Sequence, residues 1–310
     1  MPPRRRPKRA TKARRRRPRR RRRDRTPFAA GTMTARVAGP PAARGPALSD
    51  QPWWVLVLLL AGVVLAWRFA TDDTYGTIFG KILLGLPVTV AVTATAYAAA
   101  IVIGLVAGLG RLSRNPLVYN AATLYVQAIR GVPILVQIFV VAFVVLPAAI
   151  DVVNAAGQAL APVLGADNAL AGATNRAVPM GVRATAALAI AYGGFEAETF
   201  RAGIQSIERG QLDAARSLGM TWLQALRLVI LPQAIRRILP PLGNDLIAML
   251  KDSSLVSVLG VNDLTQRARL HASASFQYPP TYYTLAFIYL TLTLVLAMAV
   301  KAVEQRMEPS

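Results

Sequence analysis

The chain has 310 residues, of which 54% are hydrophobic, its mean hydropathy is +0.40 and its formal net charge is +21. Such a combination requires the charged and apolar residues to be segregated along the chain, which indicates a membrane protein. The absence of cysteine excludes a disulfide framework and a thiolate metal site.

An arginine-rich segment opens the chain. Residues 1–50 contain 18 of the 36 Lys and Arg residues and only two acidic residues. Because this segment has almost no apolar side chains to bury, it cannot offset the entropy of ordering, and we predict a disordered cytoplasmic tail. Two roles fit the tail: a positive charge that orients the first span, or a contact with nucleic acid or anionic lipid. A separate hypothesis is that translation starts at Met33, in which case residues 1–32 are not made.

Residues 51–74 are predicted to form an additional N-terminal transmembrane helix. The run from Trp53 to Trp67 is uncharged and aliphatic, with tryptophans at its ends, where amphipathic rings favour the headgroup region. A signal peptide is the alternative, but the polar sequence Thr71-Asp72-Asp73 does not resemble a small-residue cleavage site. We therefore expect a retained helix with Asp72 and Asp73 outside.

Two further apolar runs follow, and the second is interrupted. Lys81 and Arg111 enclose 29 uncharged residues, enough for a tilted span. The run Val118–Pro147 is too long for one straight span and contains Arg130-Gly131-Val132-Pro133. Proline lacks a backbone donor and clashes with the preceding turn, so we predict a kink or break there. Arg130 either marks a functional path or snorkels to the cytoplasmic face.

The second half of the chain contains three more predicted crossings. Residues 148–180, rich in Ala, Gly, Pro and Asn, are predicted to be a long external loop with room for a short amphipathic helix. Ala184–Phe200 returns the chain inward, Leu223–Leu250 carries charges that suit a bundle interior, and Tyr282–Val300 is the last span. About six crossings place both termini in the cytoplasm, where the basic clusters then also lie.

No catalytic pattern is present in the sequence. It has one histidine, His271, and it contains neither a phosphate-binding Gly-x-x-x-x-Gly-Lys-Ser/Thr loop nor a His-Glu-x-x-His metal motif. We therefore predict no catalytic residues, no metal ligands and no cofactor on this chain. His271 is interpreted as a surface or loop residue.

The segment 203–223 is polar and helix-prone, although it lies between two predicted spans. Leu212, Ala215 and Leu218 occur at i, i+3 and i+6 and predict an apolar face that fits a groove on a soluble partner. Gly219 can adopt the left-handed conformation that ends a helix. The alternative is an amphipathic helix lying in the headgroup layer. The residues predicted to contact the partner are Gln211, Asp213, Ala214, Ala215, Arg216, Leu218 and Gly219.

These residues carry a family resemblance. The order acidic-Ala-Ala, three residues, Gly, nine residues, aliphatic, any, Leu-Pro, which runs from Asp213 to Pro232, resembles the cytoplasmic EAA loop of permease subunits in bacterial ABC importers. The flanking sequences 192–204 and 231–255 resemble the polar amino acid uptake branch, and the resemblance covers roughly residues 78–306. The family usually has Glu where this chain has Asp213, so a salt bridge to the ATPase would begin one methylene shorter.

The resemblance implies an all-α inner-membrane permease domain at residues 75–306, whose last five spans form a type I importer core. It implies that this permease lies in a bacterial inner membrane with an identical or paralogous second permease. It also implies a cytoplasmic ATPase dimer that binds ATP and Mg²⁺, an extracytoplasmic solute-binding protein and an amino acid substrate. Family positions near the translocation path correspond here to Arg130, Gly131, Pro133, Asn244, Lys251, Asp252, Ser253 and Ser254.

Three alternatives remain open at this point. Lys251 and Asp252 could only cap a helix or pair with each other, rather than contact a solute. An ATP-independent secondary carrier would need ion-linked sites and usually internal repeats, and no repeat is evident in the sequence. A membrane-tethered nucleic-acid-binding protein would act through the arginine tail.

Overall fold

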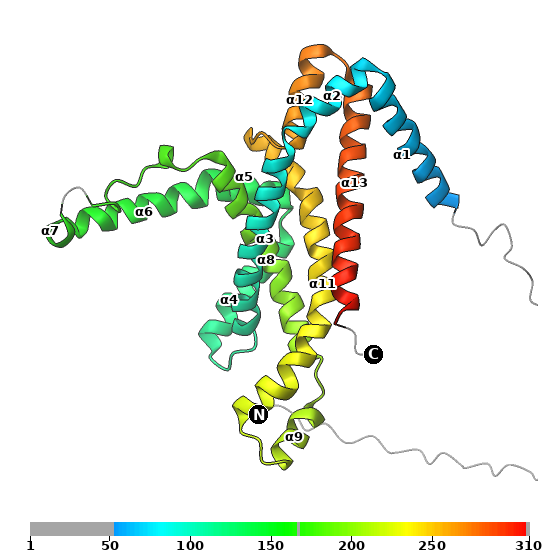
Figure 1. Ribbon diagram of the computed structural model, residues 1–310. Helices are drawn as coiled ribbons and strands as arrows, with labels where there is room; N and C mark the ends of the chain where they lie inside the picture. Colours follow the sequence, from blue (N-terminus) through cyan, green and yellow to red (C-terminus); the bar gives the residue numbers. More distant parts are fainter. Residues whose placement is uncertain (1–52, 166–167, 308–310) are drawn as a thin grey trace, which may run out of the picture. The chain divides into compact units, whose positions relative to one another are not determined.

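The computed structural model describes residues 53–165 and 168–307, and the expected disordered tail at residues 1–50 lies outside them. Every regular element in the described ranges is helical, which confirms the all-α prediction (Figure 1). In chain order the elements are α1 (Trp53–Thr71), α2 (Asp73–Leu83), α3 (Leu86–Gly110), α4 (Pro116–Gly131), α5 (Ile134–Val140), η2 (Val141–Val145), α6 (Leu146–Ala159), α7 (Ala161–Leu164), η3 (Asn175–Ala177), α8 (Met180–Gln205), α9 (Arg209–Ser217), α10 (Trp222–Ala225), η4 (Leu226–Ile230), α11 (Leu231–Asp252), η5 (Ser253–Leu259), α12 (Leu264–Ser275) and α13 (Tyr278–Gln305).

The core is built on α3 and α8, which lie side by side, with α11 packed against both (Figure 1). Glycines make the close approach possible. A Cβ added at Gly104 would overlap the Cβ of Glu196, and one added at Gly108 would lie 2.9 Å from the carbonyl oxygen of Ala197. Helices that associate in lipid are commonly packed through such small residues, because the backbones can then approach closely.

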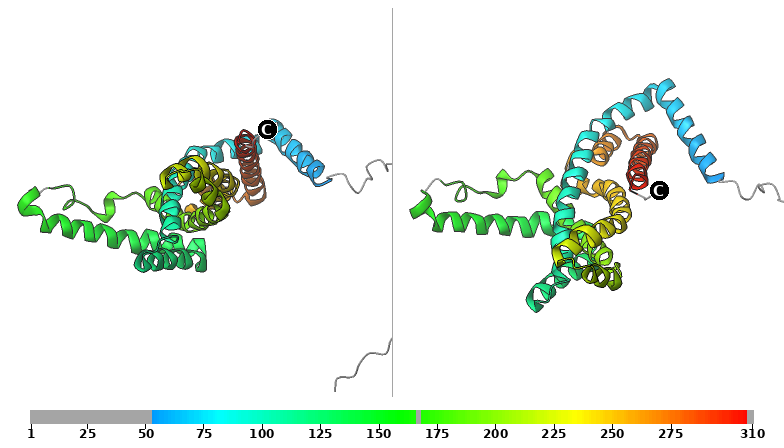
Figure 2. Two further views of the ribbon diagram at one scale, coloured as in Figure 1. Left: turned by 90° about the horizontal axis from the view of Figure 1, so that it is seen from below. Right: turned by 60° about the horizontal axis from the view of Figure 1, so that its bottom comes forward.

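The additional N-terminal helix α1 is attached through aromatic side chains. The ring of Phe69 lies 5.0 Å from that of Phe79 in α2 and 5.1 Å from that of Phe287 in α13, measured between centroids. Asp72 then caps α2 by accepting a hydrogen bond from the amide of Thr74 at 2.9 Å. Beyond this contact α1 diverges from α13 (Figures 1 and 2), and its aliphatic side chains, such as Leu60, are exposed for contact with lipid.

The predicted break before Pro133 is confirmed. Helix α4 ends at Gly131, Val132 is extended, and Pro133 stands at the start of α5. The buried side chain of Gln137 stabilises the break between α4 and α5. Its amide donates to the carbonyl oxygens of Ile129 at 2.7 Å and Val132 at 2.6 Å. The freed backbone acceptors of the interrupted helix are thereby satisfied away from water.

The segment 148–180 differs from the expected external loop in its first part. Helix α6 continues to Ala159, because the alanine-rich sequence favours helix. The chain that follows packs on α6. The Asn154 amide donates to the carbonyl oxygen of Ala171 at 2.5 Å, and a Cβ added at Gly157 would overlap the amide nitrogen of Ala171. Asn168 donates to the carbonyl oxygen of Gly157 at 3.0 Å. The first part of the segment is therefore helical, and residues 168–173 pack against it.

Several helices in the described residues are long and apolar enough to cross a membrane. They are Asp73–Gly110, Ile134–Ala159 and Tyr278–Gln305, and the shorter apolar helix Val55–Thr71 accompanies them. Helices α8 and α11 are also long, with 26 and 22 residues, but they carry charged residues that lower their apolar character. The structure thus has several membrane-length helices.

A fully buried carboxylate organises the connection between α11 and α13. Asp263 caps α12 by accepting a hydrogen bond from the amide of Gln266 at 2.8 Å. Its backbone packs so closely against Gly85 that a Cβ there would lie 2.5 Å from the carbonyl carbon of Asp263. Burial raises the pKa of the Asp263 carboxyl, although its hydrogen bonds act in the opposite direction.

Candidate functional site

The polar segment predicted to contact a partner forms a short helix with a glycine stop. Helix α9 covers Arg209–Ser217, and Gly219 follows with φ 77°, the left-handed conformation expected of it. The amide of Gly219 donates to the carbonyl oxygen of Arg216 at 2.9 Å, and that of Met220 donates to Ala215 at 3.2 Å. These bonds satisfy the last carbonyls of the helix and turn the chain sharply into α10.

The side chains of α9 divide into an exposed set and an anchored set. Leu218 is 78% exposed, whereas Ala215 is 2% exposed, so the apolar face predicted from Leu212, Ala215 and Leu218 is not a single surface. Ala215 faces its own chain, because α9 packs against α10 and η4. The exposed members of the predicted contact set are Gln211, Asp213, Ala214, Arg216, Leu218 and Gly219.

The polar segment is fixed to α8 and α11. Ile207, just before α9, belongs to a buried cluster with Phe200 of α8 and Ala234 and Ile238 of α11. The guanidinium of Arg237 in α11 donates to the carbonyl oxygen of Ser206. The residues that immediately precede α9 are therefore held against α8 and α11 by direct packing and a charged hydrogen bond.

An ion-pair network ties the same end of α8 to α3. Glu198 accepts from Arg111, at the end of α3, and from Arg201, three residues further along α8. The Arg111 side chain is only 11% exposed. The sequence did not predict this ion pairing; Arg111 and Arg201 were expected only as positive charges at the cytoplasmic ends of their helices.

The predicted path residues fall into separate groups. Arg130, Gly131 and Pro133 are exposed at the break between α4 and α5, and Asn244 is exposed on α11. Ser253 is buried, and its hydroxyl donates to the carbonyl oxygen of Leu250 at 2.7 Å. The structure of this single chain therefore does not assemble the eight residues into one pocket.

Lys251 and Asp252 diverge, although they are adjacent in sequence. Asp252 accepts a hydrogen bond from the hydroxyl of Tyr192 in α8 at 2.8 Å. Lys251 lines a cavity with residues of α12 and α13 instead. The alternative that the two charges pair with each other is wrong for the described structure, because consecutive helical residues do not face each other.

A buried carboxylate lies where α3, α8 and α11 meet. Glu196 is fully buried, and neither of its carboxylate oxygens has a hydrogen-bond partner among the described residues. Asp245 of α11 and Tyr97 of α3 lie close enough to interact with it electrostatically. Our sequence interpretation missed this group; the available signal was an ionisable residue inside an apolar run, which is a functional hypothesis by default.

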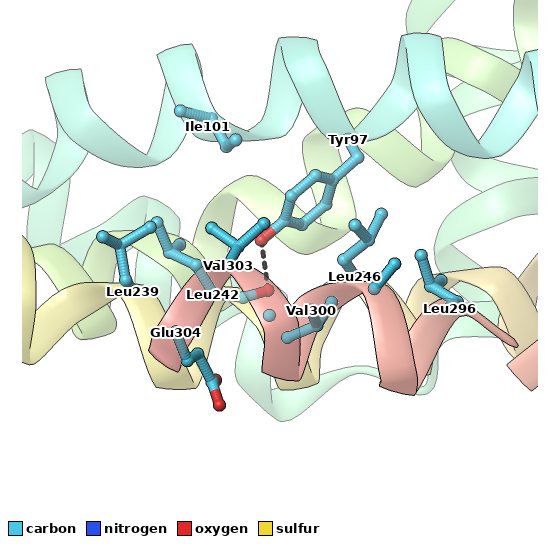
Figure 3. A pocket seen from close by; sticks show the side chains of 11 residues that line it. Tyr97, Ile101, Leu239, Leu242, Leu246, Leu296, Val300, Val303 and Glu304 are labelled. Carbon is cyan, nitrogen blue, oxygen red and sulfur yellow. Dashed lines mark hydrogen bonds between the residues drawn. The ribbon is translucent and has the colours of Figure 1, made fainter. Parts of the chain in front are cut away.

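The neighbouring pocket between α3, α11 and α13 is apolar (Figure 3). Its volume is about 320 Å³, and Ile101, Leu246 and Leu296 are typical of its lining. The hydroxyl of Tyr97 is already used, because it donates to the carbonyl oxygen of Leu242 at 2.5 Å, and Glu304 lies at the pocket's edge (Figure 3). A pocket with so few free polar groups suits hydrocarbon rather than a zwitterion.

Comparison with known proteins gives consistent matches over most of the chain. Residues 100–309 match the family described as binding-protein-dependent transport system inner membrane component. A probable glutamine ABC transporter permease protein of Bacillus subtilis (strain 168) is 34% identical over 232 residues, which cover 75% of this chain and 95% of the relative. A probable amino-acid permease protein of the same organism is 31% identical over 229 residues, covering 74% and 92%.

Among solved structures, this chain is similar to one titled "Crystal structure of an amino acid ABC transporter with histidines". The match has a TM-score of 0.60 and 34% sequence identity, and it covers 77% of this chain and 98% of that chain. Both sequence and fold therefore match over roughly the region that the motifs had indicated.

Proposed function

The chain belongs to the family of binding-protein-dependent transport system inner membrane components, and from this premise we propose that it is the permease subunit of an ATP-driven importer for polar amino acids. The names of the relatives support the solute class, since they include a probable glutamine permease and an L-cystine transport system permease protein, TcyL, both of Bacillus subtilis (strain 168). The permease core comprises the last five of about six spans, with both termini in the cytoplasm of a bacterial cell.

One observation carries the proposal. A short polar helix, α9, is exposed along most of its predicted contact set, and the residues just before it, Ser206 and Ile207, are anchored to α8 and α11. An exposed helix that follows such an anchored turn is the arrangement needed to convert movement of a soluble partner into movement of a bundle. The alternative of a helix in the headgroup layer does not require this anchorage.

The proposal assigns separate roles to separate subunits. ATP and Mg²⁺ bind to a cytoplasmic ATPase dimer that receives α9. A second permease, identical or paralogous, completes the path on which Arg130, Gly131, Pro133 and Asn244 are exposed. A solute-binding protein delivers the amino acid from outside. This chain binds no nucleotide and performs no hydrolysis in this scheme.

Reconstitution tests the proposal directly. The chain, its ATPase and its binding protein are incorporated into liposomes, and uptake of radiolabelled glutamine, glutamate, histidine, arginine and cystine is measured with and without internal ATP. We expect uptake of at least one of these amino acids that depends on ATP and on the binding protein. Accumulation without the ATPase would favour a secondary carrier, and binding of nucleic acid by residues 1–50 without any uptake would favour a tethered nucleic-acid-binding protein.

Restoring the commoner family residue at position 213 should be tolerated. Asp213 is exposed on α9, so the additional methylene of Asp213→Glu has space in solvent, and glutamate favours helix more than aspartate does. We expect ATP-dependent uptake within about fivefold of the unmodified importer, because an exposed pair is worth ~0.2–1 kcal/mol. An inactive variant with normal ATPase association would show that the loop docks differently from its relatives.

A further inference from the structure

The apolar pocket between α3, α11 and α13 lies on a different face of α11 from the residues predicted for the translocation path. Leu239, Leu242 and Leu246 line the pocket at i, i+3 and i+7 (Figure 3). Asn244 and Lys251 are exposed on another face of the same helix, because successive residues rotate by about 100°. The pocket is therefore separate from the predicted path.

Hydrocarbon is the occupant that matches the lining of this pocket. The lining is apolar apart from Tyr97 and Glu304, and the Tyr97 hydroxyl already donates to the carbonyl oxygen of Leu242. A buried water needs about two to four polar partners, so an apolar cavity does not hold water well. Helix α13 is a membrane-length helix whose outer residues, such as Leu294 and Met298, are exposed. Acyl chains of the bilayer can therefore reach the pocket.

Two arginines flank the pocket at the end where α11 begins. Helices α11 and α13 run in opposite directions (Figure 1), and a Cβ added at Gly243 would lie 2.3 Å from the side chain of Val300, which fixes their register. Arg236 lies about two turns before Gly243, and Arg306 lies nearly two turns after Val300, so both stand at this end. Both are exposed, and no ion pair in the described part of the chain includes either of them.

We propose that this pocket binds one acyl chain of an anionic phospholipid, whose phosphate pairs with Arg236 and Arg306. Basic pockets between transmembrane helices bind anionic head groups, and the guanidinium fork matches phosphate oxygens. Glu304 at the pocket's edge brings one negative charge against two positive ones, so the mouth favours an anionic lipid over a zwitterionic one. The inference goes beyond the proposed function, because it concerns a lipid and does not depend on which solute is carried.

Photo-crosslinking locates the acyl chain. The full chain is reconstituted in phosphatidylcholine nanodiscs with a small fraction of phosphatidylglycerol or phosphatidylcholine that carries a diazirine near the end of one acyl chain. Because the reactive group is in the acyl chain, head-group contacts of residues 1–50 do not contribute. Labelling of residues 239–246 and 296–303 is normalised to that of α1, which is also exposed. We expect a normalised yield at least about fivefold higher for phosphatidylglycerol, since one basic residue near the surface contributes about that factor.

Two pairs of variants separate the head-group contact from the acyl-chain contact. Replacing Arg236 and Arg306 together by glutamine should remove the preference for phosphatidylglycerol, whereas Arg227→Gln, at an exposed position of η4, should keep it. Ala299→Trp places a large side chain in the pocket and should remove most of the labelling of the α11 segment. Ala302→Trp, exposed on the same helix but outside the lining, should leave that labelling unchanged.

Three results would overturn the inference. The first is an equal normalised yield for the two lipids in the unmodified chain, and the second is an equal loss of labelling in Ala299→Trp and Ala302→Trp. The third is benzoylphenylalanine in place of Ala299 that crosslinks to a second copy of the chain rather than to lipid, which would show that another permease covers the pocket. Helicity and elution volume check the folding of each variant, and if Ala299→Trp fails this check, the lipid comparison in the unmodified chain still decides. None of these results bears on ATP-dependent uptake, which tests the proposed function separately.

Discussion

Replacing Gly219 by aspartate is expected to abolish ATP-dependent uptake while leaving insertion into the membrane intact. Gly219 has φ 77°, and an L-residue pays ~1–2 kcal/mol in this conformation. The new carboxylate would also stand at the C-terminal end of α9, where the helix dipole disfavours negative charge by roughly 0.3–1 kcal/mol. Together these terms reach ~2 kcal/mol, or about a 30-fold loss of correctly docked complex.

Steric overlap does not contribute to this prediction, because a Cβ at Gly219 would meet no atom within 4 Å. Two controls separate the remaining causes. Gly219→Asn has the size of aspartate without its charge and adopts the left-handed conformation about as readily, so it should retain more of the uptake than Gly219→Asp by the dipole contribution alone. Gly210→Asp adds the same charge near the start of α9, where the dipole favours it and the site is open.

The measurement is ATP-stimulated uptake together with co-purification of the ATPase, each normalised to the amount of permease in the membrane. Normal uptake by Gly219→Asp would count heavily against α9 as the coupling helix. A loss of membrane insertion, in contrast, would show that the turn is needed for folding of the bundle.

Features fixed by one or two neighbouring residues could be predicted from the sequence. The break at Pro133 follows from a missing donor, and the stop at Gly219 follows from the left-handed preference of glycine. It could also be predicted that the side chains of Lys251 and Asp252 contact different neighbours, because consecutive residues on a helix point in different directions. The sequence did not show which helices Lys251 and Asp252 would each contact.

Features that depend on three helices meeting could not be predicted. The environment of Glu196 is set by α3, α8 and α11 together, and nothing in the local sequence shows that Tyr97 and Asp245 converge on it. Burial of Ala215 similarly depends on the packing of α9 against η4 and α10. Periodicity identified an apolar face on α9 but could not tell an internal contact from a partner's groove.

Gly104→Ala is expected to destabilise the bundle strongly, although it adds one methyl group. The added Cβ would overlap the Cβ of Glu196 and would lie 3.0 Å from the backbone carbonyl carbon of that residue, so neither partner can move without separating α3 from α8. Overpacking of this kind costs ~1–3 kcal/mol. The separation would also disturb the only buried carboxylate in the described residues whose two oxygens both lack partners.

The matched control is Gly181→Ala in the first turn of α8, where an added Cβ would meet nothing within 4 Å. Alanine favours helix over glycine by up to ~1 kcal/mol, so this variant should be as stable as the unmodified chain or slightly more stable. The difference is measured by unfolding both variants in detergent micelles with increasing SDS and following the loss of helicity. Equal midpoints for the two variants would mean that α3 and α8 are not in close contact through Gly104, and the packing described for the core would have to be revised.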